Sequence, residues 1–210
     1  MTPLKRVMDL VSFAILFFFL WPVLLVVSLL ILVLDGRPIF YVSERMRTPH
    51  QGFGLVKFRT MRNDPQDRGV SGGDKTDRIT RTGRWLRRYR LDEVPQLWNV
   101  LVGDISFVGP RPPLRRYVEM FPDLYADVLK SRPGITGLAT LMIHEREERL
   151  LAPCRTADET EAVYVRRCVP VKAAIDILYA KRRTICLDIR IMVATVHRRM
   201  SPVRRKGRAG

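Results

Sequence analysis

Cysteine is scarce in this chain, and the few cysteines form no recognisable pattern. The 210 residues contain three, Cys154, Cys168 and Cys186, and no two of them are separated by two residues. An odd number without CxxC spacing argues against a disulfide framework and against a structural zinc site. The cysteine content instead fits a reducing compartment and therefore a domain that faces the cytosol.

The motifs of two common nucleotide-binding folds are also absent. The sequence contains neither a GxxxxGK[ST] loop nor GxGxxG, so P-loop and dinucleotide-binding folds have no support. His144 begins an HE pair like that of a zinc protease, but Glu148 stands where the second histidine would have to be. A zinc-protease function is therefore excluded.

Acidic residues are greatly outnumbered by basic ones. The chain has 37 lysines and arginines against 21 aspartates and glutamates, a formal net charge of +16. Such a balance indicates a polyanionic partner: nucleic acid, an anionic membrane surface or a phosphorylated substrate. With 47% hydrophobic residues the chain is not disordered, and its mean hydropathy near zero conceals one apolar end.

The apolar end is residues 10–34, which run for 25 residues without a charge. As a helix this segment would cover about 37 Å, enough for a bilayer core of about 30 Å. A cleavable signal peptide is disfavoured, because the segment is too long and no small-residue cleavage site follows it. The two remaining alternatives are a helix that spans the membrane and a helix that enters and returns.

Two features favour the helix that returns. Trp21 and Pro22 lie at the midpoint, where proline removes a backbone hydrogen bond and bends a helix. Basic residues flank both ends, and the positive-inside rule would place both flanks in the cytoplasm. These flanking residues are Lys5 and Arg6 on one side and Arg37, Arg45 and Arg47 on the other.

The remainder mixes short strands with helices. Residues 38–46 and 53–61 predict a hairpin, and polar residues 63–77 predict a surface loop. Thr82 would cap an arginine-rich amphipathic helix suited to an anionic membrane surface, and further helices follow up to Met200. We therefore predict an α+β, mostly helical fold with an N-terminal re-entrant membrane helix, a small β-hairpin and amphipathic interfacial helices around the active site.

This organisation predicts three parts. Residues 1–36 form the membrane-embedded re-entrant helix, residues 37–200 a cytoplasmic catalytic domain, and residues 201–210 a basic, disordered tail.

Asp92 and Glu93 form the most reactive pattern in the sequence, and two interpretations of it are open. In the simpler one, Asp92 caps the helix that follows and Glu93 is stabilised by the dipole of its first turn. In the functional one, the same helix N-terminus binds phosphate, while one carboxylate holds a divalent cation and the other attacks phosphorus. Arg111, between two prolines, would offer a fixed fork for phosphate, and Lys57 and Arg59 would add charge.

At these positions the sequence resembles the bacterial monotopic phosphoglycosyl transferases, often called sugar transferases. The resemblance covers nearly the whole chain and depends on several motifs in order. They are Lys5, Arg6 and Asp9 before the apolar segment, residues 57–61 (KFRTM), 91–101 (LDEVPQLWNVL), 103–112 (GDISFVGPRP) and 132–139 (RPGITGLA), and Asp188 in the last helix.

The resemblance implies transfer of a sugar phosphate from a nucleotide diphosphate sugar, by family expectation a UDP-sugar, to polyprenyl (undecaprenyl) phosphate. Asp92 would attack the β-phosphate, release the nucleoside monophosphate and carry the phospho-sugar until the polyprenyl phosphate takes it. Glu93, with Asp92, would bind Mg²⁺, while Lys57, Arg59 and Arg111 hold phosphates. Asp188 matches an acidic residue near the site. Such a step initiates exopolysaccharide, lipopolysaccharide or capsule synthesis at the bacterial inner membrane, with the catalytic domain on its cytoplasmic face.

The sequence departs from the family pattern at two places. Trp21 precedes the midpoint proline where relatives usually have serine, and residues 140–145 (TLMIHE) replace a glutamine and a polar Gly-Arg stretch. The second departure bears on which sugar is transferred. Larger relatives carry extra spanning helices at the N-terminus, so this chain resembles the minimal catalytic form.

A protein of another class is the alternative function. A membrane-anchored basic protein that binds anionic lipid or nucleic acid would explain the charge equally well, but it would not need Asp92 and Glu93 beside Arg111. We therefore expect a nucleotide sugar, polyprenyl phosphate and an anionic bilayer as partners and no nucleic acid; a homo-oligomer is compatible with the sequence.

Overall fold

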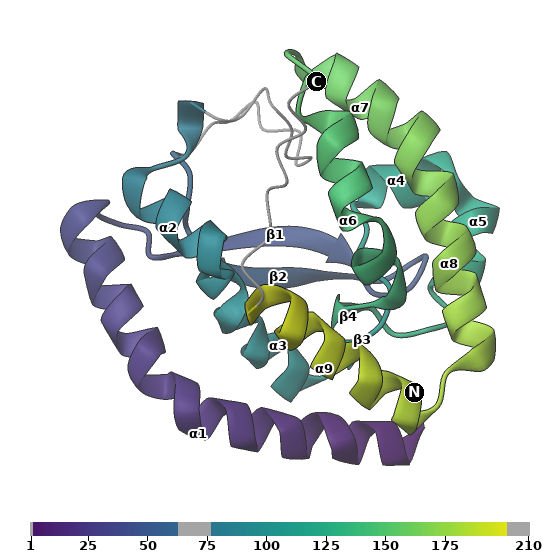
Figure 1. Cartoon of the computed structure of the whole chain (residues 1–210), viewed down its shortest axis with the longest axis horizontal. Coiled ribbons are helices and arrows are strands. Elements are labelled where there is room, and N and C mark those ends of the chain that lie inside the picture. The colour runs from purple at the N-terminus through teal and green to yellow at the C-terminus, as the bar shows by residue number, and fades with distance from the viewer. Residues whose placement is uncertain (1, 63–76, 201–210) are drawn as a thin grey trace, which may run out of the picture.

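The computed structural model describes residues 2–62 and 77–200 (Figure 1). Most of the expected surface loop at 63–77 and all of the expected tail at 201–210 lie outside the described residues. The helices are α1 (Pro3–Leu34), α2 (Arg81–Tyr89), α3 (Leu97–Val102), α4 (Arg115–Met120), α5 (Pro122–Val128), α6 (Leu138–Leu151), α7 (Ala157–Val163), α8 (Val169–Arg182) and α9 (Ile185–Met200), with a 3-10 helix η2 (Leu91–Gln96) and a π-helical turn η3 (Tyr164–Cys168). The strands are β1 (Phe40–Met46), β2 (Gly52–Phe58), β3 (Ser106–Val108) and β4 (Gly134–Thr136). The prediction of a mostly helical fold with a small hairpin is confirmed.

Helix α1 is long, apolar and bent. Thr2 caps its first turn, and Pro22 lies within it, where the missing N–H breaks one helical hydrogen bond. Figure 1 shows α1 bending near its middle and following the edge of the molecule. Within the described residues it is the one helix long and apolar enough to cross a membrane. Its middle is exposed, Phe18 to 70% and Phe19 to 69%, which supports association with a membrane.

The N-terminal end of α1 is fixed to the rest of the protein by polar contacts. The Arg6 guanidinium donates to the carbonyl oxygens of Val100 and Leu101, each at 2.6 Å. The Asp9 carboxylate accepts from the Ser106 hydroxyl at 2.9 Å and from the Phe107 N–H at 3.1 Å. These contacts tie the first turns of α1 to α3 and β3.

The C-terminal end of α1 packs on the same body. Val27 and Ile31 are buried against Phe58 of β2 and Leu86 of α2. Just beyond the helix, the Thr80 hydroxyl donates to the Asp35 carboxylate at 3.1 Å. Both ends of α1 therefore contact one folded unit, although about 30 residues separate them.

The hairpin β1–β2 has a register that places two cations on one face. Tyr41 lies opposite Lys57 and Arg45 lies opposite Phe53. Residues directly opposite each other share a face, and so do residues two apart along a strand. Lys57 and Arg45 therefore project from the same face of the hairpin.

Helix α2 begins two residues earlier than the sequence indicated. Its N-cap is Thr80, whose hydroxyl accepts from the Gly83 N–H at 2.9 Å, and Thr82 lies buried in the first turn. The prediction of Thr82 as the cap is therefore wrong. Gly83 allows this placement, because a β-carbon there would overlap the carbonyl of Thr60.

The parallel pair β3–β4 brings two motif segments into backbone contact. Gly109 donates its N–H to the Thr136 carbonyl at 2.9 Å, and Gly134 donates to Pro110 at 2.9 Å. A β-carbon at Gly109, Gly134 or Gly137 would overlap the facing backbone. This close approach fixes the chain immediately before Arg111.

Candidate active site

The site is built around the junction between α2 and η2. Arg90 ends α2 with a left-handed backbone conformation, φ 57°, and the chain then continues as the 3-10 helix that contains Asp92 and Glu93. Helix α3 begins only at Leu97, without a side-chain cap. Asp92 thus lies inside a helical turn rather than ahead of one, and its predicted role as the N-cap is wrong.

Glu93 is a buried carboxylate surrounded by cations. It is 6% exposed, and its Oε1 lies 3.4 Å from Arg111 Nη2, 3.6 Å from Lys57 Nζ and 3.6 Å from Arg90 Nη1. Removing a carboxylate from water costs several kcal/mol unless opposite charges compensate. Three neighbouring cations supply that compensation.

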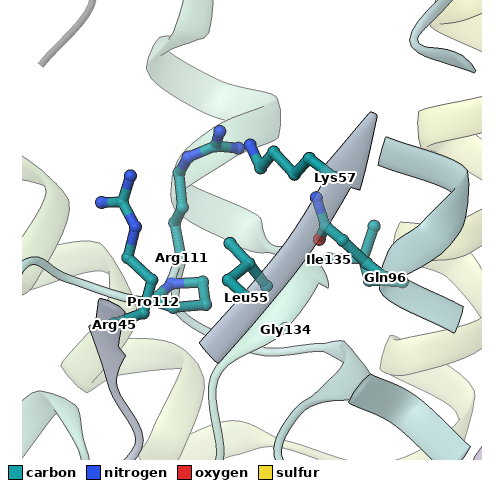
Figure 2. Close-up of a pocket in the computed structure, with 8 residues that line it drawn as sticks. All are labelled: Arg45, Leu55, Lys57, Gln96, Arg111, Pro112, Gly134 and Ile135. Carbon is teal, nitrogen blue, oxygen red and sulfur yellow. The ribbon is translucent and has the colours of Figure 1, made fainter. Parts of the chain in front are cut away.

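Lys57 and Arg111 point toward each other across a small pocket that Arg45 and Gln96 also line (Figure 2). Burial, followed by the charge of Arg111, lowers the pKa of Lys57 to about 8. Burial and Arg111 likewise lower the pKa of Arg45 to about 10. Such shifts are expected where several cations crowd a desolvated space, and an anion placed among them would relieve the repulsion.

Asp92 differs from Glu93 in its surroundings. Among the described residues, its buried Oδ1 has no hydrogen-bond partner. Burial and the neighbouring Glu93 raise the pKa of Asp92, while Lys57, Arg87 and Arg90 lower it. The result is a carboxylate with little direct solvation beside a cluster of cations, a combination typical of functional groups.

The structure places two of the predicted site residues elsewhere. The Arg59 guanidinium donates to the carbonyl oxygens of Asp35, Gly36 and Arg37, at 2.5, 2.8 and 2.9 Å, and so holds the end of α1. Asp188 pairs with the ammonium of Lys5 and accepts from the Tyr179 hydroxyl. The contacts of Arg59 and Asp188 are therefore at the two ends of α1.

Two cations of the site were missed by sequence reasoning. Arg90 belongs to an arginine-rich helix, and only its left-handed backbone singles it out. Arg45 reads as a basic flank of the apolar segment, and its place beside Lys57 follows from the hairpin register. Arg45 is four residues from Tyr41 and therefore shares its strand face. That spacing points to Lys57 only once the hairpin turn, and with it the pairing of Tyr41 with Lys57, is known.

The carboxylates of the site could hold Mg²⁺ together with a bound substrate. Within residues 2–62 and 77–200, no three metal-binding side chains of the His, Cys, Asp and Glu type cluster together. Mg²⁺ is commonly held by one or two carboxylates, with water and substrate phosphates completing its shell. Asp92, with its unpartnered Oδ1, and Glu93 match that number and chemistry. The residues therefore fit an ion shared with a bound diphosphate.

Comparison with known proteins gives the class first. The family described as Bacterial sugar transferase matches residues 1–202, nearly the whole chain, including α1 and the site. The chain belongs to this family.

Individual relatives differ in length. The chain is 35% identical to the exopolysaccharide production protein PSS of Rhizobium leguminosarum, over 92% of this chain and 93% of that protein. It is 35% identical to a UDP-glucose:undecaprenyl-phosphate glucose-1-phosphate transferase of Caulobacter vibrioides, over 91% of this chain and 68% of that protein. It is 30% identical to UDP-N-acetylgalactosamine-undecaprenyl-phosphate N-acetylgalactosaminephosphotransferase of Aeromonas hydrophila, over 92% of this chain but only 43% of the relative.

Proposed function

We propose that the protein is a membrane phosphoglycosyl transferase, which moves a sugar-1-phosphate from a nucleotide diphosphate sugar to undecaprenyl phosphate. The observation that carries this proposal is the half-buried Asp92 beside the buried Glu93, whose carboxylate faces Lys57, Arg90 and Arg111. The named activities of the Caulobacter and Aeromonas relatives support the same substrates, with UDP as the donor nucleotide.

In the first half-reaction an oxygen of the Asp92 carboxylate attacks the β-phosphorus of the donor. An oxygen–phosphorus bond forms to Asp92 as the bond from that phosphorus to the bridging oxygen breaks, and the nucleoside monophosphate leaves with the bridging oxygen. In the second, an oxygen of undecaprenyl phosphate attacks the same phosphorus and restores the carboxylate. Splitting one difficult transfer in two is the usual benefit of a covalent intermediate.

The cations around Glu93 stabilise the diphosphate. Three of them, Lys57, Arg90 and Arg111, lie within 3.6 Å of the Glu93 carboxylate. Arg45 lines the pocket beside Lys57 and Arg111. The surplus positive charge attracts the donor and neutralises charge on the transferring phosphoryl group, which is the main task of a protein in phosphoryl transfer. A Mg²⁺ ion held by Glu93 and Asp92 would supply further charge neutralisation when bound.

Helix α1 supports a re-entrant topology. Because both ends of α1 contact the same folded unit, both would lie on one side of the bilayer while the exposed middle enters it. We propose that this is the cytoplasmic side of the bacterial inner membrane, because nucleotide sugars are made in the cytoplasm. Exposed Trp85, Tyr89 and Trp98 on α2 and α3 would lie at the interface, where aromatic rings are favoured.

The alternative of a basic, membrane-anchored binding protein accounts for the net charge but not for the site. It would leave the two carboxylates among the cations without a role, and the family match argues for transfer chemistry.

Asp92→Asn tests the proposal. Wild-type protein, incubated with short polyprenyl phosphate and a panel of nucleotide sugars that includes UDP-glucose and UDP-N-acetylgalactosamine, should release nucleoside monophosphate from one of them. The variant should release it at least about a thousandfold more slowly, as expected for loss of a nucleophile. Chelation should stop the wild-type reaction and Mg²⁺ should restore it.

Asp123→Asn, on the exposed first turn of α5, is the matched control and should retain wild-type activity. Both variants should enter membranes normally. Full turnover by Asp92→Asn would remove Asp92 as the nucleophile and with it the proposed chemistry.

A further inference from the structure

The segment in which this chain departs from the sugar-transferase pattern reaches the site through His144. This residue lies on α6, and its Nε2 is 2.7 Å from a terminal nitrogen of Arg90. A guanidinium only donates hydrogen bonds. Nε2 must therefore accept, which makes the imidazole neutral with its proton on Nδ1.

Arg90 is held on two sides. One terminal nitrogen faces Glu93 at 3.6 Å, and the other faces His144. Its backbone is left-handed, a conformation that residues other than glycine and asparagine rarely adopt. The position thus combines an unfavourable backbone conformation with a side chain fixed at both ends of its guanidinium.

Glu148, one turn further along α6, competes for the same ring. Its Oε1 lies 3.3 Å from Nε2, so a proton on Nε2 would pair the ring with Glu148 and repel Arg90. Burial and the charge of Arg90 lower the pKa of His144, while Glu148 and Glu147 raise it and Arg111 lowers it. The nearest positive groups therefore favour the neutral ring that Arg90 requires.

We propose that His144 is a positioning residue, which holds the Arg90 guanidinium against Glu93 and so fixes one of the cations that receive the donor diphosphate. This inference rests on the proposed transferase function. It gives α6 a role in the site that acts through Arg90 rather than through Asp92 or Glu93.

Activity measurements on His144 variants test this role. His144→Leu should lower kcat/KM for the nucleotide sugar about tenfold, the scale expected for losing a hydrogen bond to a charged group. His144→Gln should stay within about twofold of wild type, because its side-chain oxygen can accept where Nε2 did. In an Arg90→Met background, His144→Leu should change kcat/KM by less than about twofold, because the two effects share one contact.

Arg146→Gln, exposed on the same helix and outside residues 140–145, is the control and should match wild type. Thermal unfolding of each variant separates loss of activity from loss of fold. An equal loss from His144→Leu with and without Arg90, or failure of His144→Gln to recover activity, would overturn the proposal.

A spectroscopic measurement is independent of turnover. The three histidines can be labelled with ¹⁵N in detergent-solubilised protein, and the His144 signal is identified by its loss in His144→Gln. Wild type should show the Nδ1–H tautomer, and Arg90→Met should return the ring to the Nε2–H form usual in water. Wild-type protein that is inactive on every donor but shows the Nδ1–H tautomer would refute the proposed function and leave the Arg90 contact standing; the Nε2–H tautomer in active protein would refute the contact alone.

Discussion

Asp176 shows how a single buried acid couples the stability of this protein to pH. It lies on α8 and is 5% exposed, and its Oδ1 has no hydrogen-bond partner among the described residues. Burial raises its pKa to about 7, with Lys172 opposing. Between pH 4 and pH 7 the folded state therefore keeps a proton that the unfolded state has released, so the free energy of unfolding falls as pH rises through this window.

Asp176→Asn should remove this dependence. At pH 8 the variant should unfold several degrees higher than wild type, because it avoids the cost of ionising a buried carboxyl, which reaches the order of a few kcal/mol. Near pH 4, where the folded carboxyl keeps its proton and the unfolded one is only about half ionised, the difference should shrink. Thermal unfolding in detergent at pH 4.5, 6 and 8 measures it, with the exposed Glu119→Gln as control. If the unfolding temperatures of wild type and Asp176→Asn changed in parallel with pH, the raised pKa of Asp176 would be contradicted.

The sequence identifies the carboxylates of the site more readily than its cations. Asp92 and Glu93 are adjacent, and Arg111 is marked by its two flanking prolines, so local pattern alone selects them. Arg45 and Arg90 depend on a strand register and on one left-handed residue. Both are decided by packing rather than by neighbours in the chain, which is why the sequence does not single them out.

Helix α1 carries the main prediction at the scale of an element. Its two ends should be accessible from the same, cytoplasmic side of the membrane, because both are tied to one folded unit. Leu4 and Tyr41 are both exposed. Single cysteines in their place should be labelled by a membrane-impermeant thiol reagent only when the reagent is given access to the cytoplasmic face.

The background for this experiment should have Cys186 replaced by serine, because Cys186 is exposed whereas Cys154 and Cys168 are buried. A cysteine in place of exposed Glu119 on α4 gives the cytoplasmic reference. Labelling of the residue 4 position from the periplasm would mean that α1 spans the bilayer once.

The elements themselves are largely predictable, and their ends are less so. The apolar segment, the hairpin and the long C-terminal helices follow from periodicity and turn residues. Thr82 failed as a cap because Thr80 stands two residues earlier and Gly83 lets the helix approach Thr60. Asp92 failed as a cap because the left-handed Arg90 starts a 3-10 turn before it. In both cases a tertiary contact or a single backbone conformation outweighed the local preference.

At the scale of the whole molecule, α1 and the site are built on the same small scaffold. The hairpin carries Lys57 and Arg45 on one face and packs Phe58 against the end of α1. The beginning of α1 lies beside the beginning of α9 (Figure 1). There Lys5 pairs with Asp188 of α9, and Asp188 also accepts from the Tyr179 hydroxyl of α8. The position of the site relative to α1 is therefore set by contacts within one folded unit.

The most direct test of this account is to trap the phospho-sugar on the protein. Purified protein is incubated with its nucleotide sugar and Mg²⁺ but without polyprenyl phosphate, quenched, and analysed by intact-mass and peptide mass spectrometry. We predict an added sugar phosphate on the peptide containing Asp92, which disappears when polyprenyl phosphate is supplied and never forms in Asp92→Asn. A protein that turns over while its mass is unchanged, or that carries the group on another side chain, would contradict it.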